Sequence, residues 1–196
     1  QALAVVILRQ EGARMDIVGE TQSCEPVQAI ELAGGGLTAR ILSWGAVIQY
    51  LRLKGHAAPL VLGFPEFADY PVHSPFFGSV PGRNVNRVRN GELVIDGNMY
   101  PLEHNFRGRH NLHGGTNGIG TRNWTFVAVA KDEAVLEIRC PDGNMGFPGN
   151  LDVRCTYRLS GKGTLSVVFE AVTDKPTVCN IAQHSYFNLD DGGATD

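Results

Sequence analysis

Hydrophobic and polar residues alternate regularly in the C-terminal third of the chain. One parity of residues 151–159 holds apolar or weakly polar side chains and the other holds mostly charged ones: Leu151, Val153, Cys155, Tyr157 and Leu159 against Asp152, Arg154, Thr156 and Arg158. A period of two predicts a β-strand with one buried and one wet face. A glycine-rich turn follows at 161–163, and alternation resumes at Leu165, Val167, Phe169 and Ala171. The two runs therefore predict an antiparallel hairpin.

Other segments repeat this design on a shorter scale. Predicted strands lie at 37–44, 47–53, 93–95, 99–102, 124–130 and 135–140, with a turn at Asp96-Gly97. No stretch of helical length places apolar residues at three-and-four spacing, and 24 glycines and 10 prolines supply turns. Because no repeat, linker or low-complexity segment divides the chain, we expect residues 1–196 to form a single all-β domain, an antiparallel β-sandwich.

Composition and charge exclude several classes of protein. The 196 residues are 43% hydrophobic, enough for a core. With 17 basic and 20 acidic residues, a net charge of −3 and no basic run, we expect no nucleic-acid partner. The apolar run 2–8 lacks a basic region before it and is too short to span a bilayer, which argues against a secretory signal and a membrane partner. Four widely spaced cysteines indicate free thiols and a cytoplasmic location.

The first polar cluster is Gly82-Arg83-Asn84-Val85-Asn86-Arg87. Two arginines and two asparagines around one apolar residue can present a fork of donors to hydroxyl groups. The alternative is a surface turn whose arginines pair with acids or cap backbone carbonyls. The spacing alone leaves both interpretations open.

The second cluster, residues 111–115, places His113 before Gly114-Gly115. Glycines allow the backbone to approach a ligand closely or to adopt positive φ, although a histidine that merely fills a turn fits the same pattern. Together with His104 and His110, His113 also invites a metal interpretation. No carboxylate or cysteine stands at ligand spacing, and His110 follows the cationic Arg109, so we expect no metal.

The third cluster is His184-Ser185-Tyr186-Phe187-Asn188-Leu189, which we expect to end a strand beginning near Val178. His184 and Tyr186 stand two residues apart, so both side chains would face one pocket. A histidine gains and loses its proton near neutral pH and is a natural acid or base. A buried histidine bound to backbone is the alternative. Ser185 has no acid or second base at a telling distance, so a hydrolase triad gains no support.

The clusters and the motifs between them, in this order, resemble the aldose 1-epimerase (galactose mutarotase) family. The resemblance runs from about Ile30 to Leu189 and rests on Gly45-Ala46, 61–64, 82–87, 112–115, 142–149, 156–159, 173–176 and 184–189. It implies a large antiparallel β-sandwich with a sugar cleft on one concave sheet. The implied reaction interconverts the α and β anomers of a free aldose, such as galactose or glucose, and needs no metal or organic cofactor.

The resemblance also implies roles for individual residues. His184 would be the general acid at the ring oxygen, and His113 a second pocket histidine that binds and polarises the sugar. Asn86 and Arg87 would hold sugar hydroxyls, with Tyr186 beside the acid. The aldose is then the expected small-molecule partner.

Two departures from the family pattern stand out. Ala182-Gln183 replaces the more usual Thr-Asn before His184, so we expect altered hydrogen bonding beside the acid. The family's general-base glutamate and a sugar-binding aspartate lie beyond the position where this sequence ends, in an expected loop at 190–196. We therefore expect an N-terminal, truncated sandwich that is inactive or nearly so by itself, because one of the two proton-transfer partners is absent.

Two other functions are compatible with the same residues. A relative that binds carbohydrate or regulates, without turnover, would keep the cleft. An epimerase for hexose phosphates would need extra cations aimed at a phosphate, for which Arg83, Arg87, Arg107 and Arg109 are candidates. The motifs look more like the free-sugar branch.

Overall fold

The computed structural model describes residues 8–9 and 14–189 and confirms the all-β class. A five-stranded sheet has the order β1 (Leu8–Arg9), β10 (Thr125–Val129), β11 (Glu133–Cys140), β12 (Leu151–Ser160) and β13 (Thr164–Thr173). A four-stranded sheet runs β2 (Met15–Glu20), β3 (Pro26–Gly34), β4 (Leu37–Leu42) and β5 (Ile48–Leu53). The pairing of β1 with β10 is parallel, and the other ladders between strands are antiparallel.

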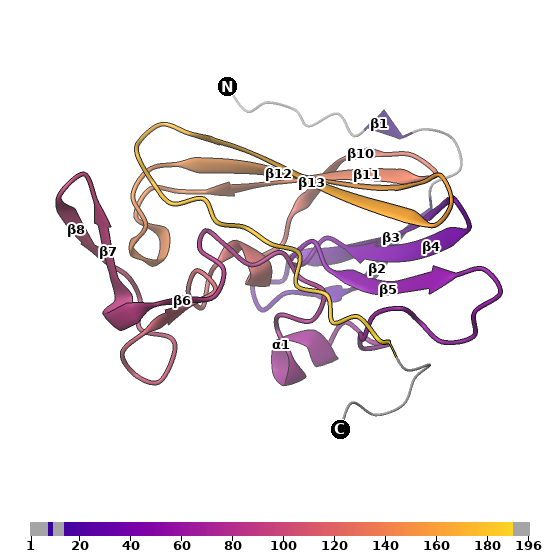
Figure 1. Cartoon of the computed structure of the whole chain (residues 1–196), viewed down its shortest axis with the longest axis horizontal. Coiled ribbons are helices and arrows are strands. Elements are labelled where there is room, and N and C mark those ends of the chain that lie inside the picture. The colour runs from indigo at the N-terminus through magenta and orange to yellow at the C-terminus, as the bar shows by residue number, and fades with distance from the viewer. Residues whose placement is uncertain (1–7, 10–13, 190–196) are drawn as a thin grey trace.

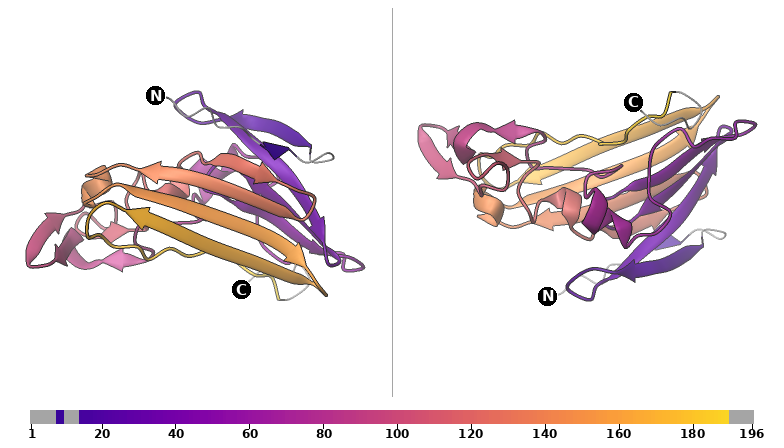
Figure 2. Two further views of the ribbon diagram at one scale, coloured as in Figure 1. Left: turned by 90° about the horizontal axis from the view of Figure 1, so that it is seen from above. Right: turned by 90° about the horizontal axis from the view of Figure 1, so that it is seen from below.

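Smaller elements extend from one end of the two sheets (Figures 1 and 2). The ladder of β6 (Arg87–Val88) with β9 (Asn111–Leu112) and the hairpin of β7 (Glu92–Ile95) with β8 (Asn98–Pro101) lie there. The described helices are short: α1 (Asp69–His73) and the 3-10 turns Arg89–Gly91, Ile119–Thr121 and Asn144–Gly146. None of these described helices is long and apolar enough to cross a membrane.

The alternation predicted for residues 151–159 is confirmed by β12. Its five apolar-parity side chains are all buried, and it pairs in register with β11, Leu136 opposite Cys155. The predicted hairpin with β13 forms through the turn at 161–163. Ala171, expected on the inner face, is exposed, because β13 is the edge strand of the described sheet.

The core fills the space between the two sheets. Its buried side chains come from both, among them Ile30, Leu32, Ala39 and Ile41 from one sheet and Phe126, Leu136, Val153 and Cys155 from the other. Tyr157 is fully buried there and donates its hydroxyl to the carbonyl oxygen of Ala46 at 2.7 Å. A second cluster on the far face of β3 and β4 contains Trp44, Phe67 and Tyr70 and seats α1.

The wet face of the five-stranded sheet carries a ladder of ion pairs. Arg158 pairs with Glu133, Arg154 with Glu137, and Arg139 with Asp152. In each case the two residues stand directly opposite in the β11–β12 register. Cross-strand pairs of opposite charge support the register, although each exposed pair contributes only about 0–1 kcal/mol.

The prediction of a strand at residues 178–189 is wrong. After β13 the chain runs back past β6 toward α1 without a regular ladder (Figure 1), making only isolated bridges at Asn180 and Phe187. Its backbone groups bind several different segments, because the Asn180 N–H donates to the Arg83 carbonyl at 2.7 Å and the His184 N–H donates to the Ser79 carbonyl at 2.8 Å. The segment is therefore an extended connector. The expected loop at 190–196 and most of the apolar run 2–8 lie outside the described residues, so a single domain over 1–196 stays a prediction.

Arg83 is the largest fully buried side chain, with 1% of its surface exposed. Its guanidinium donates to the carbonyl oxygens of Cys140, Pro141, Pro148 and Gly149 and to the Thr177 hydroxyl, at 2.7–3.1 Å. The Phe147 ring lies beneath it, 5.9 Å from the guanidinium carbon. Arg83 therefore binds backbone carbonyls, as the alternative interpretation of residues 82–87 allowed, and does not present its donors to a ligand. It does so in the interior and not in a surface turn.

Replacing Arg83 with methionine tests this role. The variant fills similar space but leaves several buried carbonyl groups without donors, so we expect the free energy of unfolding to fall by more than about 3 kcal/mol. The matched control, Arg139→Met, removes an exposed ion pair and should change it by no more than about 1 kcal/mol. Denaturant unfolding of the complete protein measures both, and equal small changes would contradict the role.

Candidate active site

Two histidines from distant parts of the chain face each other at the end of the sandwich. The ring centroids of His113 and His184 lie 5.0 Å apart, with an edge-to-face angle of 87°. The Phe76 ring lies beside both, with its centroid 4.5 Å from that of His113 and 6.4 Å from that of His184. The ring centroid of Tyr186 lies 5.3 Å from that of His184, so the two side chains are neighbours, although the strand from which we expected this is absent at residues 178–189.

Reciprocal hydrogen bonds position His113 against the first polar cluster. The His113 N–H donates to the Asn86 carbonyl at 3.0 Å, and the Asn86 N–H donates to His113 Nδ1 at 3.0 Å. Both residues adopt positive φ, 66° for Asn86 and 54° for His113, at the end of the β6–β9 ladder. Asparagine tolerates this conformation better than most residues. The motifs 82–87 and 111–115 therefore form one unit.

The glycine after His113 is required by a close approach of two backbones. A Cβ atom added at Gly114 would lie 1.9 Å from the carbonyl oxygen of Gly82, and φ at Gly114 is +85°. Both facts exclude an ordinary side chain. The glycine of the second cluster thus lets the His113 turn lie directly against the first cluster.

His184 is held by the segment that precedes the first cluster. Its N–H donates to the Ser79 carbonyl at 2.8 Å, and its carbonyl accepts from the Gly78 N–H at 3.3 Å. Gln183 strengthens this contact: its Nε2 donates to the Gly78 carbonyl at 2.6 Å, and its Oε1 accepts the Ser185 N–H at 2.7 Å. Gln183, one of the departures from the family pattern, thus links the residues around His184 to Gly78.

Burial, the neighbouring His184 and the Arg87 guanidinium lower the pKa of His113 to about 4. His113 is therefore neutral at pH 7. Since Nδ1 accepts the Asn86 N–H, the neutral ring carries its proton on Nε2. His113 is thus a hydrogen-bond donor with a fixed tautomer.

The remaining predicted site residues lie at the rim of the cluster. Arg87 is exposed, donates to Asn86 Oδ1 at 2.7 Å and stacks on Phe106 at 4.7 Å. Tyr186 is 45% exposed, and its ring lies 4.8 Å from Phe77. The structure therefore brings together His113, His184, Asn86, Arg87 and Tyr186.

The histidines considered for a metal divide between two places. His104 Nε2 lies 2.8 Å from the Asn90 carbonyl oxygen, and His110 Nδ1 accepts the Asn90 N–H at 3.0 Å, whereas His113 belongs to the histidine pair. Within residues 8–9 and 14–189, no three His, Cys, Asp or Glu side chains gather as a metal site would require.

Two hollows in the described surface lie elsewhere. One of about 680 Å³ opens over the four-stranded sheet between Arg40, Tyr50 and Phe64, and one of about 580 Å³ lies on the wet face near Glu137 and Arg139. Neither is lined by the two histidines. The candidate site is therefore defined by the side chains that converge at the histidine pair.

The sequence pattern does not predict that Phe76 and Phe77 lie at the site, nor that Gln183 links Gly78 to Ser185. The two phenylalanines supply the apolar wall behind both histidines and Tyr186. Nothing in their local pattern separates them from ordinary core residues. Only the tertiary contacts bring them to the site.

Fold and site together define an antiparallel β-sandwich with two histidines packed edge to face beside asparagine and arginine side chains. The family model described as Aldose 1-epimerase matches residues 28–195. The chain belongs to the aldose 1-epimerase family.

Named relatives agree with this assignment. The chain is 38% identical to rat galactose mutarotase over 87% of its own length and 50% of the relative's. It is 32% identical to Escherichia coli aldose 1-epimerase over 79% of its own length and 45% of the relative's. A solved galactose 1-epimerase from Lactobacillus acidophilus superposes with a TM-score of 0.78 at 30% identity, covering 91% of this chain and 54% of that one. The chain thus spans about half the length of the curated relatives it matches.

The lowered pKa of His113 predicts a pH dependence of stability. The unfolded chain takes up a proton on this side chain near its ordinary value of about 6.5, and the folded chain only near 4. Between these values the unfolded state binds more protons, so the free energy of unfolding should fall as pH drops from 6.5 to 4.

Ring-proton NMR titration and denaturant unfolding at several pH values measure these two effects. His113→Gln should reduce the slope of stability against pH in this window relative to the unsubstituted protein. An unchanged slope, or a His113 resonance that titrates near pH 6.5, would contradict the assignment.

Proposed function

We propose that the complete protein containing this chain interconverts the α and β anomers of a free aldose of the galactose or glucose type. The observation that carries the proposal is the edge-to-face pair of His113 and His184 beside Asn86 and Arg87. Ring opening of an aldose needs a proton taken from the anomeric hydroxyl and a proton given to the ring oxygen. A histidine next to hydroxyl-binding donors suits the second step.

In the proposed mechanism His184 is the general acid. As a base removes the proton of the anomeric hydroxyl, the electron pair forms the carbonyl, the bond between the anomeric carbon and the ring oxygen breaks, and the ring oxygen takes the proton of His184. The carbonyl end rotates, and the reverse transfers close the ring on the other face. We assign the base to a carboxylate of the complete protein outside this chain.

The neighbouring groups position the sugar. Neutral His113 would donate from Nε2 to a sugar oxygen without a competing positive charge beside the acid. Arg87, held by Asn86 Oδ1 and the Phe106 ring, would donate to hydroxyl groups, and Asn86 would add a polar contact. Tyr186, which is partly exposed beside His184, would contact the sugar with its ring or its hydroxyl.

We also propose a cytoplasmic location for the complete protein. All four cysteines are free thiols, two of them buried and two exposed. Exposed free thiols suit a reducing compartment.

Replacing His184 with asparagine tests the acid. We expect kcat for anomer interconversion to fall by about 10² to 10⁴ because the ring oxygen loses its proton donor. Polarimetry with fresh α-galactose and α-glucose measures the rate. His73→Asn, in the exposed last turn of α1, is the matched control and should leave the rate unchanged.

Two outcomes would reject the proposed function. An undiminished kcat in the His184→Asn variant would remove His184 from the chemistry. Sugar binding by the unsubstituted complete protein without any catalysed interconversion would indicate a carbohydrate-binding relative.

A further inference from the structure

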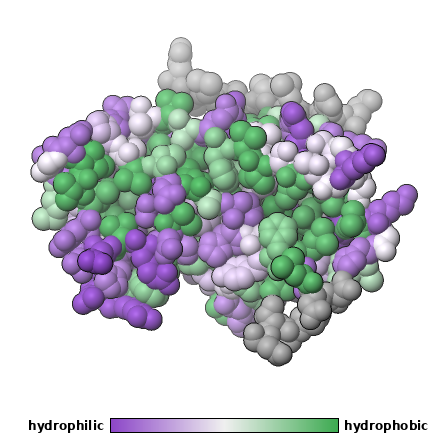
Figure 3. All heavy atoms as spheres, in the orientation of Figure 1, coloured by the Kyte–Doolittle hydropathy of each residue, from purple (hydrophilic) through white to green (hydrophobic). Residues whose placement is uncertain are grey.

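The turn that carries His113 has an unfavourable backbone conformation. His113, Gly114 and Gly115 follow one another at φ of 54°, 85° and 95°. Positive φ costs free energy in a residue with a side chain and persists only where the surrounding structure fixes it. Figure 3 shows hydrophilic residues gathered over this end of the molecule, at its lower left, and the contacts that hold the two ends of the turn are polar.

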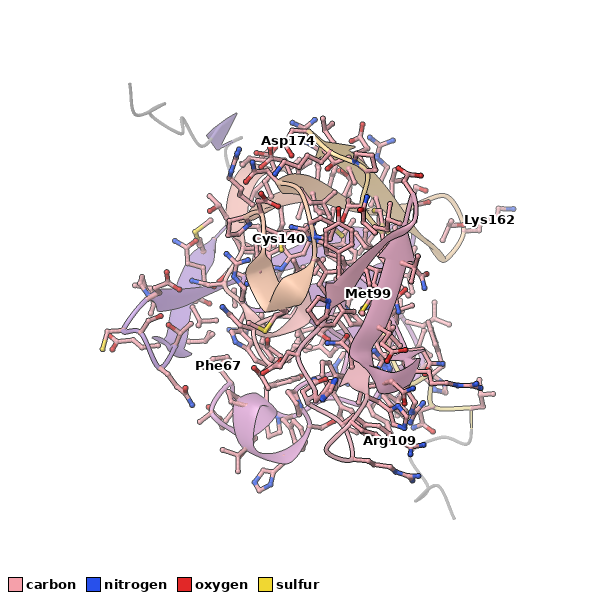
Figure 4. The ribbon with its side chains drawn as sticks, turned by 90° about the vertical axis from the view of Figure 1, so that its left-hand side faces the viewer. Phe67, Met99, Arg109, Cys140, Lys162 and Asp174 are labelled. Atoms are coloured by element: carbon pink, nitrogen blue, oxygen red, sulfur yellow. The ribbon has the colours of Figure 1, made fainter. Side chains whose placement is uncertain are left out.

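The segment 103–105 lies beside the strand that leads into the turn. It follows the hairpin strand that carries Met99, which lies at the front of Figure 4. Its first and third side chains, Glu103 and Asn105, both reach residues 112–116. Side chains two residues apart on an extended backbone share one side. The segment therefore contacts both ends of the turn through its side chains.

Asn105 acts as a second strand partner for Leu112. Its Oδ1 accepts the Leu112 N–H at 2.7 Å, and its Nδ2 donates to the Leu112 carbonyl at 2.9 Å. A side-chain amide offers one acceptor and one donor group, as a neighbouring peptide would. Leu112 also pairs with Arg87 in the β6–β9 ladder, so the residue directly before His113 has two partners.

Glu103 fixes the residue that follows the turn. Its Oε2 accepts the Thr116 N–H and its Oε1 accepts the Thr116 hydroxyl, both at 2.6 Å. Hydrogen bonds to a carboxylate are shorter and stronger than those between neutral groups. The same carboxylate packs against Gly115, where an added Cβ would lie 2.7 Å from Oε2. One short segment thus binds the turn at both ends.

We propose that Glu103 and Asn105 are positioning residues for His113 in the proposed anomer interconversion. They hold Leu112 and Thr116, and through them the backbone that directs the His113 ring toward the sugar. The inference rests on the proposed function and assigns no chemistry to either residue, because their hydrogen bonds are made to the turn itself. Neither residue belongs to the motifs that carry the family resemblance.

Alanine substitution of either residue in the complete protein tests this role. Asn105→Ala and Glu103→Ala should each lower kcat/KM for anomer interconversion by about tenfold to a hundredfold, because a small displacement of a positioned group has a cost of that order. Polarimetry with fresh α-galactose measures the rate, and circular dichroism shows whether each variant is folded at the assay temperature. Glu103→Gln can still accept the Thr116 N–H and donate to the hydroxyl, so it should restore kcat/KM to within about threefold.

Asn98→Ala and Glu92→Ala are the matched controls, because both side chains are exposed on the neighbouring β7–β8 hairpin. They should leave kcat/KM unchanged. If Asn105→Ala does not fold, Asn105→Asp replaces it under the same criteria, since the aspartate keeps the acceptor for the Leu112 N–H and loses the donor.

A spectroscopic readout shows whether His113 is the affected group. NMR shifts of its ring nitrogens report which of them carries the proton. In the unsubstituted protein and in both controls we expect the proton on Nε2, because Nδ1 accepts the Asn86 N–H. Asn105→Ala and Glu103→Ala should lose this fixed tautomer in part, because a displaced turn weakens that hydrogen bond.

The outcomes separate this inference from the proposed function. Folded Asn105→Ala and Glu103→Ala variants with unchanged kcat/KM overturn the inference and leave the function intact. A lower rate with an unchanged His113 tautomer also overturns it, since the loss would then not act through His113. If the unsubstituted protein turns over no sugar, the function fails and the tautomer decides. A change in the two variants and not in the controls then supports the positioning role, and no change overturns it.

Discussion

The buried guanidinium of Arg83 is the interaction on which the candidate site depends. It gathers carbonyl groups from the ends of β11 and the turn before β12 and adds the Thr177 hydroxyl after β13. Those segments belong to the five-stranded sheet, whereas the residues after Arg83 lead directly to Asn86 and Arg87. A single side chain thus ties the motif at residues 82–87 to the five-stranded sheet. Burial of a cation without a carboxylate is costly, and only a full set of aligned carbonyl dipoles offsets that cost.

The same anchor explains how two distant histidines meet. The backbone of Arg83 accepts the Asn180 N–H, which positions the connector that leads to His184, and Gly82 lies against Gly114, which positions the turn that carries His113. The segments that carry the two histidines are therefore both held against the same short stretch, Gly82-Arg83. The His184 N–H donates to the Ser79 carbonyl and the His184 carbonyl accepts from the Gly78 N–H, which fixes the backbone that carries the His184 ring. Residues on loops are usually positioned less precisely than residues on strands, and these backbone contacts compensate for that difference.

The sequence predicts the sheet far better than the loops that form the site. Alternation locates β12 and its partner β13 because one face of β12 is buried along its whole length, so apolar residues recur at every second position. It does not predict β2 or β3, whose residues mix small, polar and apolar types, and it predicts a strand at 178–189 where the backbone binds several segments in turn. His113, His184, Asn86, Arg87 and Tyr186 do converge, but the contacts of Phe76 and Gln183 leave no local signature. The depressed pKa of His113 likewise depends on tertiary neighbours.

Charge is arranged differently on the sheet and on the loops, and the difference follows from what each must do. On β11 and β12, cations and anions alternate across the ladder and largely neutralise each other, so that face supports the register without a strong field. At the candidate site, the neutral His113 lies beside His184, and the charge of Arg87 helps to lower the pKa of the His113 ring. A protonated His113 would repel the Arg87 guanidinium. The loss of charge at His113 thus removes a repulsion between two cationic side chains at the site, whereas the sheet avoids such repulsion by pairing each arginine with a carboxylate.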